Sequence, residues 1–114
     1  MKVSVETGDE VVIAAVGGEI DVATSPGLRQ RLIEAVENHT ECLVIDLSET
    51  RYLDSSGIQV LFDVAARLHS RQQTMHLVIA PDSFLSDLAG AVDLGSVATI
   101  HREREAAIEA CKGG

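Results

Sequence analysis

The fold is decided by the stretch CLVIDLSETRYLDSSGIQVLFDVAARL, residues 42–68. Its first six residues are apolar β-formers interrupted only by Asp46, a pattern typical of a central strand that is covered on both faces. After the connection SETRYLDSSG, apolar residues recur at the spacing of one helix face, at Ile58, Leu61, Phe62, Ala65 and Leu68. A buried strand followed by an amphipathic helix predicts one strand–helix unit of a parallel α/β sheet.

Further units of this kind flank the stretch on both sides. KVSVE and VVIAAVGG, residues 2–6 and 11–18, predict an antiparallel hairpin because only a short turn joins them. Ser25 as N-cap and Pro26 after it predict a helix that runs to about Asn38. MHLVIA and VATI predict two more strands, Ser83 caps a third predicted helix, and REREAAIEACKGG predicts a closing helix that stops at Gly-Gly.

The order of these elements predicts one α/β domain over residues 1–114. We expect a mixed sheet of about four to five strands, mostly parallel with an antiparallel N-terminal edge, and about four helices.

Charge and hydropathy exclude several classes of protein. The chain carries 18 acidic residues against 9 Lys and Arg, a net charge of −9. No basic cluster is present to neutralise phosphates, so we expect no direct nucleic-acid partner. No apolar run approaches the roughly 20 residues of a membrane helix, and the N-terminus does not resemble a signal peptide. We therefore expect no membrane partner and a cytoplasmic location.

The cysteines and histidines carry no recognisable metal-binding pattern. Cys42 and Cys111 lie far apart without CxxC spacing, so neither a disulfide framework nor a zinc site is expected. Cys42 is interpreted as a small buried hydrophobe. The four histidines stand singly, without metal-ligand spacing.

No catalytic motif is present either. The sequence holds no Gly-x-Ser-x-Gly elbow, no dinucleotide-binding glycine pattern and no Walker A loop. Asp46, at the end of its strand, could suggest the phospho-acceptor of a receiver domain. That domain also needs an acidic pair after its first strand and a late Lys, whereas Asp9 and Glu10 precede a strand and Lys is absent between Lys2 and Lys112. We expect Asp46 to bind backbone groups of its own turn instead.

Two loops that open helices remain as the candidate site: EID at 19–21 and LDSSG at 53–57. Both follow strands, so a parallel sheet would bring them to the same edge. Ser55 and Ser56 could simply cap the helix. A phosphate on one of them would also be tolerated at a helix N-terminus, and it would add −1.5 to −2 charge beside Asp54 and Asp21. The residues alone leave both interpretations open.

Both stretches also resemble a known family. VGGEIDVATSPGLRQRL (16–32) and VIDLSETRYLDSSGIQVLFDVAARL (44–68) are similar to the two hallmarks of the STAS domain of bacterial anti-sigma-factor antagonists, and the resemblance covers nearly the whole chain. It implies a small, non-enzymatic α/β domain that binds a serine-kinase anti-sigma factor and so releases the sigma factor. The kinase would phosphorylate the second serine of DSSG, here Ser56, to prevent binding, and a serine phosphatase would restore it.

The resemblance also implies which residues contact the partner. Phosphorylation is expected at Ser56, and the expected partner-binding residues are Asp21, Thr24, Asp54, Ser55, Ser56 and Gly57. No catalytic residue, metal or cofactor is expected in this chain. The second half departs from the family pattern, with SRQQT in place of a Gly-rich turn. A STAS subunit of another assembly, such as a lipid-transport complex or a stress-signalling scaffold with constitutive docking, is the alternative.

Overall fold

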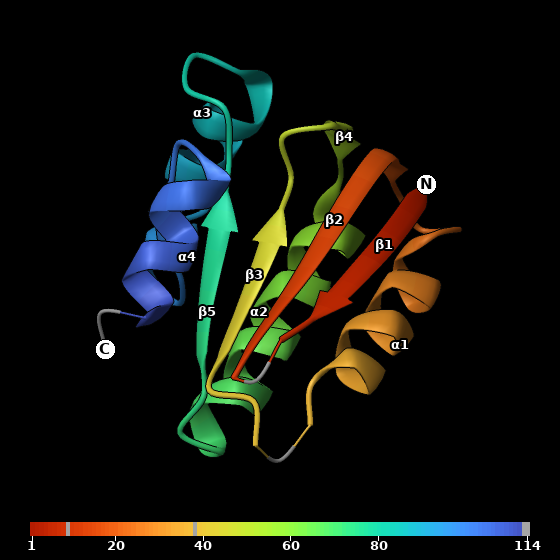
Figure 1. The fold of residues 1–114 in the computed structure, drawn as a ribbon. Coiled ribbons are helices and arrows are strands. Elements are labelled where there is room, and N and C mark those ends of the chain that lie inside the picture. Colours follow the sequence, from red (N-terminus) through yellow and green to blue (C-terminus); the bar gives the residue numbers. More distant parts are fainter. Residues whose placement is uncertain (9, 38, 113–114) are drawn as a thin grey trace.

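The computed structural model describes residues 1–8, 10–37 and 39–112 (Figure 1). The elements within these ranges are β1 (Lys2–Thr7), β2 (Val11–Ile20), α1 (Ser25–Ala35), β3 (Cys42–Asp46), β4 (Thr50–Leu53), α2 (Ser55–Ser70), β5 (Thr74–Val78), α3 (Phe84–Ala91), the 3₁₀ turn η1 (Leu94–Ser96), β6 (Thr99–His101) and α4 (Arg104–Lys112). The predicted helix end at Asn38, the receiver-type acid Asp9 and the Gly113–Gly114 stop lie outside the described residues.

The strands form one mixed sheet in the order β1-β2-β3-β5-β6, with β4 paired to β2 beside this path. β1 runs antiparallel to β2, and the other pairs are parallel. The predicted α/β class and antiparallel N-terminal edge are therefore confirmed. Helices α1 and α2 cover one face of the sheet and α4 covers the other (Figure 1).

Six strands are described instead of the four to five expected, because residues 50–53 form β4 and not a loop. Strand β2 is longer than β3, and their pairing ends at Ala15 and Asp46. Beyond Gly18, whose φ of +90° bends the strand, β2 pairs with β4. The Thr50 hydroxyl fixes this junction by donating to the Val16 carbonyl at 2.6 Å. The residues of β4, TRYL, do not alternate between buried and exposed positions, so the sequence did not reveal this strand.

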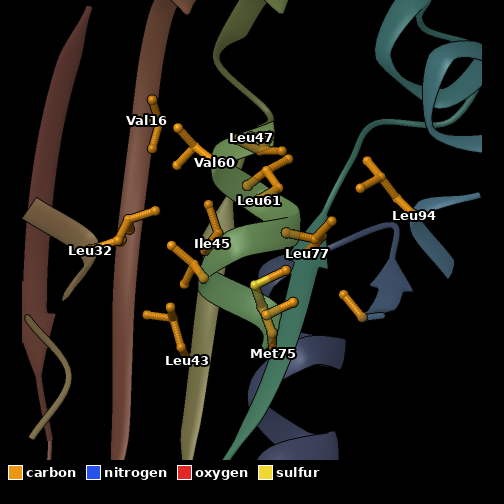
Figure 2. Close-up of a cluster of buried hydrophobic side chains, with 14 of the residues drawn as sticks. Val16, Leu32, Leu43, Ile45, Leu47, Val60, Leu61, Met75, Leu77 and Leu94 are labelled. Atoms are coloured by element: carbon orange, nitrogen blue, oxygen red, sulfur yellow. The ribbon is translucent and has the colours of Figure 1, made fainter. Parts of the chain in front are cut away.

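The larger part of the core lies between the sheet and helices α1, α2 and α3 (Figure 2). Ile45 of β3 and Leu77 of β5 meet Leu61 of α2 there, and all three are fully buried. The predicted buried face of α2 is only partly right, because Ile58 and Phe62 remain partly exposed. Val60 and Val64 are buried in their place, together with Leu61, Ala65 and Leu68. Since α2 contacts both the sheet and α1, its buried stripe is turned toward that neighbour.

Helix α1 begins differently from the prediction. Its N-cap is Thr24, not Ser25, and no side chain caps it. Ser25 is buried in the first turn, and its N–H donates to the Asp21 carbonyl at 2.8 Å. The Asp21 carbonyl thus binds an N–H group at the start of α1 that a capping side chain would otherwise bind. The Ser83 cap of α3 is confirmed, since its hydroxyl accepts from the Ser86 N–H at 3.1 Å.

The opposite face is covered by α4 and holds a second, smaller core around Val44, Val78 and Ala107. There Cys42 and Cys111 form a disulfide, with their Cα atoms 5.9 Å apart. The expectation that they stay unpaired was wrong. The bridge spans 69 residues, because the closing helix returns across the start of β3, and sequence spacing cannot report such a long-range approach.

His76 and His101 are also neighbours, contrary to the expectation of single histidines. Pairing of β5 with β6 places the rings 5.1 Å apart between centroids, nearly parallel. Burial, and then the neighbouring His101, lowers the pKa of His76. The imidazole of His76 is therefore neutral at pH 7.

Asp46 behaves as expected and also makes a long-range contact. Its Oδ1 accepts from the Ser48 N–H at 3.0 Å, within its own turn. Its Oδ2 accepts from Arg104 Nε of α4 at 2.9 Å. Burial opposes ionisation, but the hydrogen bonds from Ser48 and the Arg104 charge outweigh it, so the pKa of Asp46 lies below its usual value. Asp46 thus helps to hold α4 on the sheet.

Candidate functional site at the helix openings

The two predicted loops meet at one edge of the sheet, as expected. Ile20 at the end of β2 pairs with Leu53 at the end of β4. The N–H of Asp54 then donates to the Ile20 carbonyl at 3.2 Å. The residues that follow each strand, 21–24 and 54–57, are therefore side by side.

Asp54, not a serine, caps helix α2. Its backbone is extended, and its Oδ1 accepts from the N–H groups of Ser56 and Gly57 at 3.0 and 3.2 Å. Of the two interpretations left open for the serines, simple capping does not hold, because the cap position is one residue before Ser55. Both serines are already helical, so neither hydroxyl is required to start the helix.

The two serines differ in their surroundings. Ser55 is exposed, whereas Ser56 is half-buried, and its hydroxyl donates to Asp54 Oδ1. This bond from the Ser56 side chain is the largest cause that lowers the pKa of Asp54, with further contributions from the N–H groups of Gly57, Ser56 and Val22. The contribution from Val22 links the second loop to the first.

Asp21 and Thr24 shape the first loop through reciprocal bonds. Asp21 Oδ1 accepts from the N–H groups of Ala23 and Thr24 at 3.0 and 3.1 Å. The Asp21 N–H in turn donates to Thr24 Oγ1 at 2.9 Å. Such an Asx turn is locally encoded, and it presents Val22 to solvent with 76% of its surface exposed.

Gly57 allows the second loop to approach the first. A Cβ at this position would lie 2.3 Å from Leu53 Cδ1 and 2.7 Å from Ile20 Cγ2. Both neighbours are buried. Only glycine therefore lets the first turn of α2 lie directly on the paired ends of β2 and β4.

Apolar side chains surround these loops, and sequence reasoning missed them. Val22, Tyr52 and Phe84 are among the large hydrophobic residues that remain exposed. Tyr52 pairs with Glu19 at the end of β2, and α3, which begins at Phe84, contacts β4. Val22 thus lies in the first loop, Tyr52 lies in β4 just before the second loop, and Phe84 begins the helix that contacts β4. The sequence signal that could have revealed these side chains is an apolar residue within an otherwise polar connection.

Acidic side chains near these loops are engaged in hydrogen bonds or ion pairs. Among the described residues, Asp54 is the acid that contacts the Ser56 hydroxyl, and its lowered pKa makes it a weak general base. Asp46, the alternative phospho-acceptor, is ion-paired on the α4 face. Among the residues the structure describes, no helix combines the length and hydrophobicity needed to cross a bilayer.

Comparison with known proteins agrees with the geometry. The family profile of the STAS domain matches residues 2–107. The anti-sigma-F factor antagonist RsfB of Mycobacterium tuberculosis is 32% identical over 88 residues, which cover 67% of this chain and 72% of that protein. An anti-sigma-B factor antagonist of Staphylococcus epidermidis is 26% identical, covering 82% and 91%.

A solved structure shows the same architecture. The crystal structure of an anti-sigma factor antagonist from Mycobacterium paratuberculosis superposes with a TM-score of 0.86 at 26% identity, covering 97% of this chain and 93% of that one. With the profile match over almost the full length and the β4–α2 junction in place, the chain belongs to the STAS-domain family of anti-sigma factor antagonists, non-enzymatic regulators whose partner is an anti-sigma factor.

Proposed function

We propose that this chain is a phosphorylation-switched antagonist in the cytoplasm. Its unphosphorylated form binds a serine-kinase anti-sigma factor and releases the sigma factor, and phosphorylation of Ser56 by that kinase ends binding. A serine phosphatase resets the switch. The observation that carries the proposal is the position of Ser56, half-buried in the first turn of α2 beside both loops.

The partner-binding surface is proposed to combine the loop residues with the apolar side chains around them. Asp21, Thr24, Asp54, Ser55, Ser56 and Gly57 form its centre. Val22, Tyr52 and Phe84 supply exposed apolar area on the same edge of the sheet. A few well-placed apolar and aromatic side chains commonly dominate binding energy.

A phosphate on Ser56 would change this surface more than the fold. The neighbouring Asp54 carboxylate would repel a phosphate of about −1.5 to −2 charge, and water at the surface screens this repulsion. The helix N-terminus stabilises a nearby negative charge by about 0.3 to 1 kcal/mol, which offsets part of this repulsion. The net cost is small against a stability of about 5 to 15 kcal/mol. Between docked surfaces, like charges cost several kcal/mol.

The choice of Ser56 over Ser55 rests on the family resemblance of the DSSG stretch. The structure adds that the Ser56 hydroxyl already contacts Asp54, so a phosphate there must displace that contact. Ser55 is exposed and could be modified without displacing it. The two serines therefore form a matched pair for mutagenesis.

The test combines intact mass and binding measurements. Incubation with the cognate kinase and ATP should add one phosphate to the wild type and to Ser55→Ala, and none to Ser56→Ala. In calorimetry, Ser56→Glu should bind the kinase at least about tenfold more weakly than Ser56→Ala, which corresponds to about 1.4 kcal/mol. Phosphate on Ser55, or on neither serine, would overturn the assignment. Equal affinity of Ser56→Glu and Ser56→Ala would instead favour constitutive docking in another assembly.

A further inference from the structure

The disulfide on the α4 face is part of a larger cluster of metal-ligand side chains. One ligand atom each from Cys42, His76 and Cys111 lies within 4.8 Å of the other two. These residues come from β3, β5 and α4. Cys42 and His76 are buried, at 2% and 8% exposure, whereas Cys111 is half-buried. Three elements of the folded chain thus hold the cluster in place.

The distances suit a tetrahedral metal once the disulfide is open. Zn–S bonds of about 2.3 Å and Zn–N bonds of about 2.0 to 2.1 Å place ligand atoms roughly 3.5 to 3.8 Å apart. Reduction breaks the S–S bond and frees the two thiol side chains to turn toward a shared metal ion.

His101 lies where it can orient the ring of the proposed metal ligand His76. His76 Nδ1 and His101 Nε2 are 2.9 Å apart and share a hydrogen bond. This contact leaves Nε2 of His76 as the ring nitrogen available to a metal. Metal-bound histidines almost always have such a partner on the other nitrogen, and its loss typically weakens affinity 10- to 100-fold.

We propose that the reduced chain binds one Zn²⁺ through Cys42 Sγ, Cys111 Sγ and His76, with His101 as the orienting residue and water in the fourth position. Two thiolates and an imidazole are ligands that select zinc over magnesium or calcium. Disulfide and metal are then alternative states of the same two cysteines.

The interconversion balances as follows. A dithiol reductant transfers two electrons and two protons to the disulfide by thiol–disulfide exchange, giving two cysteine thiols and an oxidised dithiol. Zn²⁺ then replaces the two thiol protons, which pass to solvent. An oxidised disulfide reagent reverses the first step after the metal leaves. Because disulfides persist only in oxidising surroundings, the metal-binding state belongs to reducing ones.

The zinc site is separate from the proposed phosphorylation site. Ser56 lies in α2, whereas Cys111 lies in α4 on the opposite face of the sheet (Figure 1). Ser56→Ala should therefore bind zinc like the wild type. Failure of the zinc site and failure of the phosphorylation switch can thus be told apart.

The experiment titrates Zn²⁺ into the full chain after reduction with a phosphine and competes it against a chromophoric chelator. We expect one equivalent to bind reduced wild type and none to bind the oxidised chain. Cys111→Ser and His76→Gln should lose high-affinity binding, and His101→Gln should bind about 10- to 100-fold more weakly. The exposed His69→Gln is the matched control and should be unchanged.

Binding of Co²⁺ gives a spectroscopic signal that a change in protein stability alone cannot produce. Co²⁺ bound to reduced wild type should give a thiolate charge-transfer band, weaker in Cys111→Ser and unchanged in His69→Gln. Circular dichroism of each apo variant checks that it folds. Absence of the band, or equal zinc affinity in the wild type and a folded Cys111→Ser, would overturn the proposal.

Discussion

Replacing Gly57 with alanine tests the packing that positions Ser56. The added Cβ would lie 2.3 Å from Leu53 Cδ1 and 2.7 Å from Ile20 Cγ2. Carbon atoms normally contact at about 3.5 to 4.0 Å, so Leu53 or the helix must move by roughly 1 Å. Leu53 and Ile20 are 2% and 0% exposed, so neither can turn into solvent.

The expected cost follows from two opposing effects. Overpacking of a core typically costs about 1 to 3 kcal/mol, and the better helix propensity of alanine returns at most about 1 kcal/mol. These two effects leave a net loss of about 0 to 3 kcal/mol, and we expect Gly57→Ala to lower the free energy of unfolding by about 1 to 2 kcal/mol, the middle of that range. The first turn of α2 should also shift away from β4, which should weaken binding at the proposed anti-sigma factor surface.

Gly27→Ala is the matched control because it lies in the first turns of α1 and a Cβ there meets nothing within 4 Å. It should raise stability by about 0.5 to 1 kcal/mol. Urea unfolding followed by far-UV circular dichroism suits both variants, since the chain has no Trp. If Gly57→Ala proved as stable as Gly27→Ala with the same slope m, the close contact of α2 with Ile20 and Leu53 would be refuted.

Two further predictions concern acidic side chains. Asp54→Ala removes the cap of α2 and should lower the free energy of unfolding, measured in urea, by about 0.5 to 2 kcal/mol. Asp54→Asn can still cap the helix and should lower it less. Equal losses in the two variants would show that the cap bonds contribute little. Asp46 has a lowered pKa in the fold, so its stabilisation is complete above the unfolded value of about 4 and is lost as the pH falls through the folded value. Arg104→Gln should flatten this acid limb of a stability–pH curve, and an unchanged limb would show that Arg104 does not hold the carboxylate.

Much of the fold could be predicted because its signals are local. The apolar run at 42–47 and the helical spacing at 58–68 are properties of short segments, and they predicted β3 and α2 correctly. The same segments predicted that EID and DSSG would share an edge, because parallel strands place their carboxyl ends together. Strand β4 was missed because its four residues form a strand only by pairing with the end of β2.

The sequence by itself determined the class of fold, the two loops and the pair of serines, since propensity, periodicity and turn chemistry act over a few residues. Only the tertiary structure decided which group caps α2, which apolar side chains remain exposed around it, and that Cys42, His76 and Cys111 converge. The last of these depends on α4 returning to β3 across 69 residues. Such a contact is set by the packing of the whole domain, which no local pattern records.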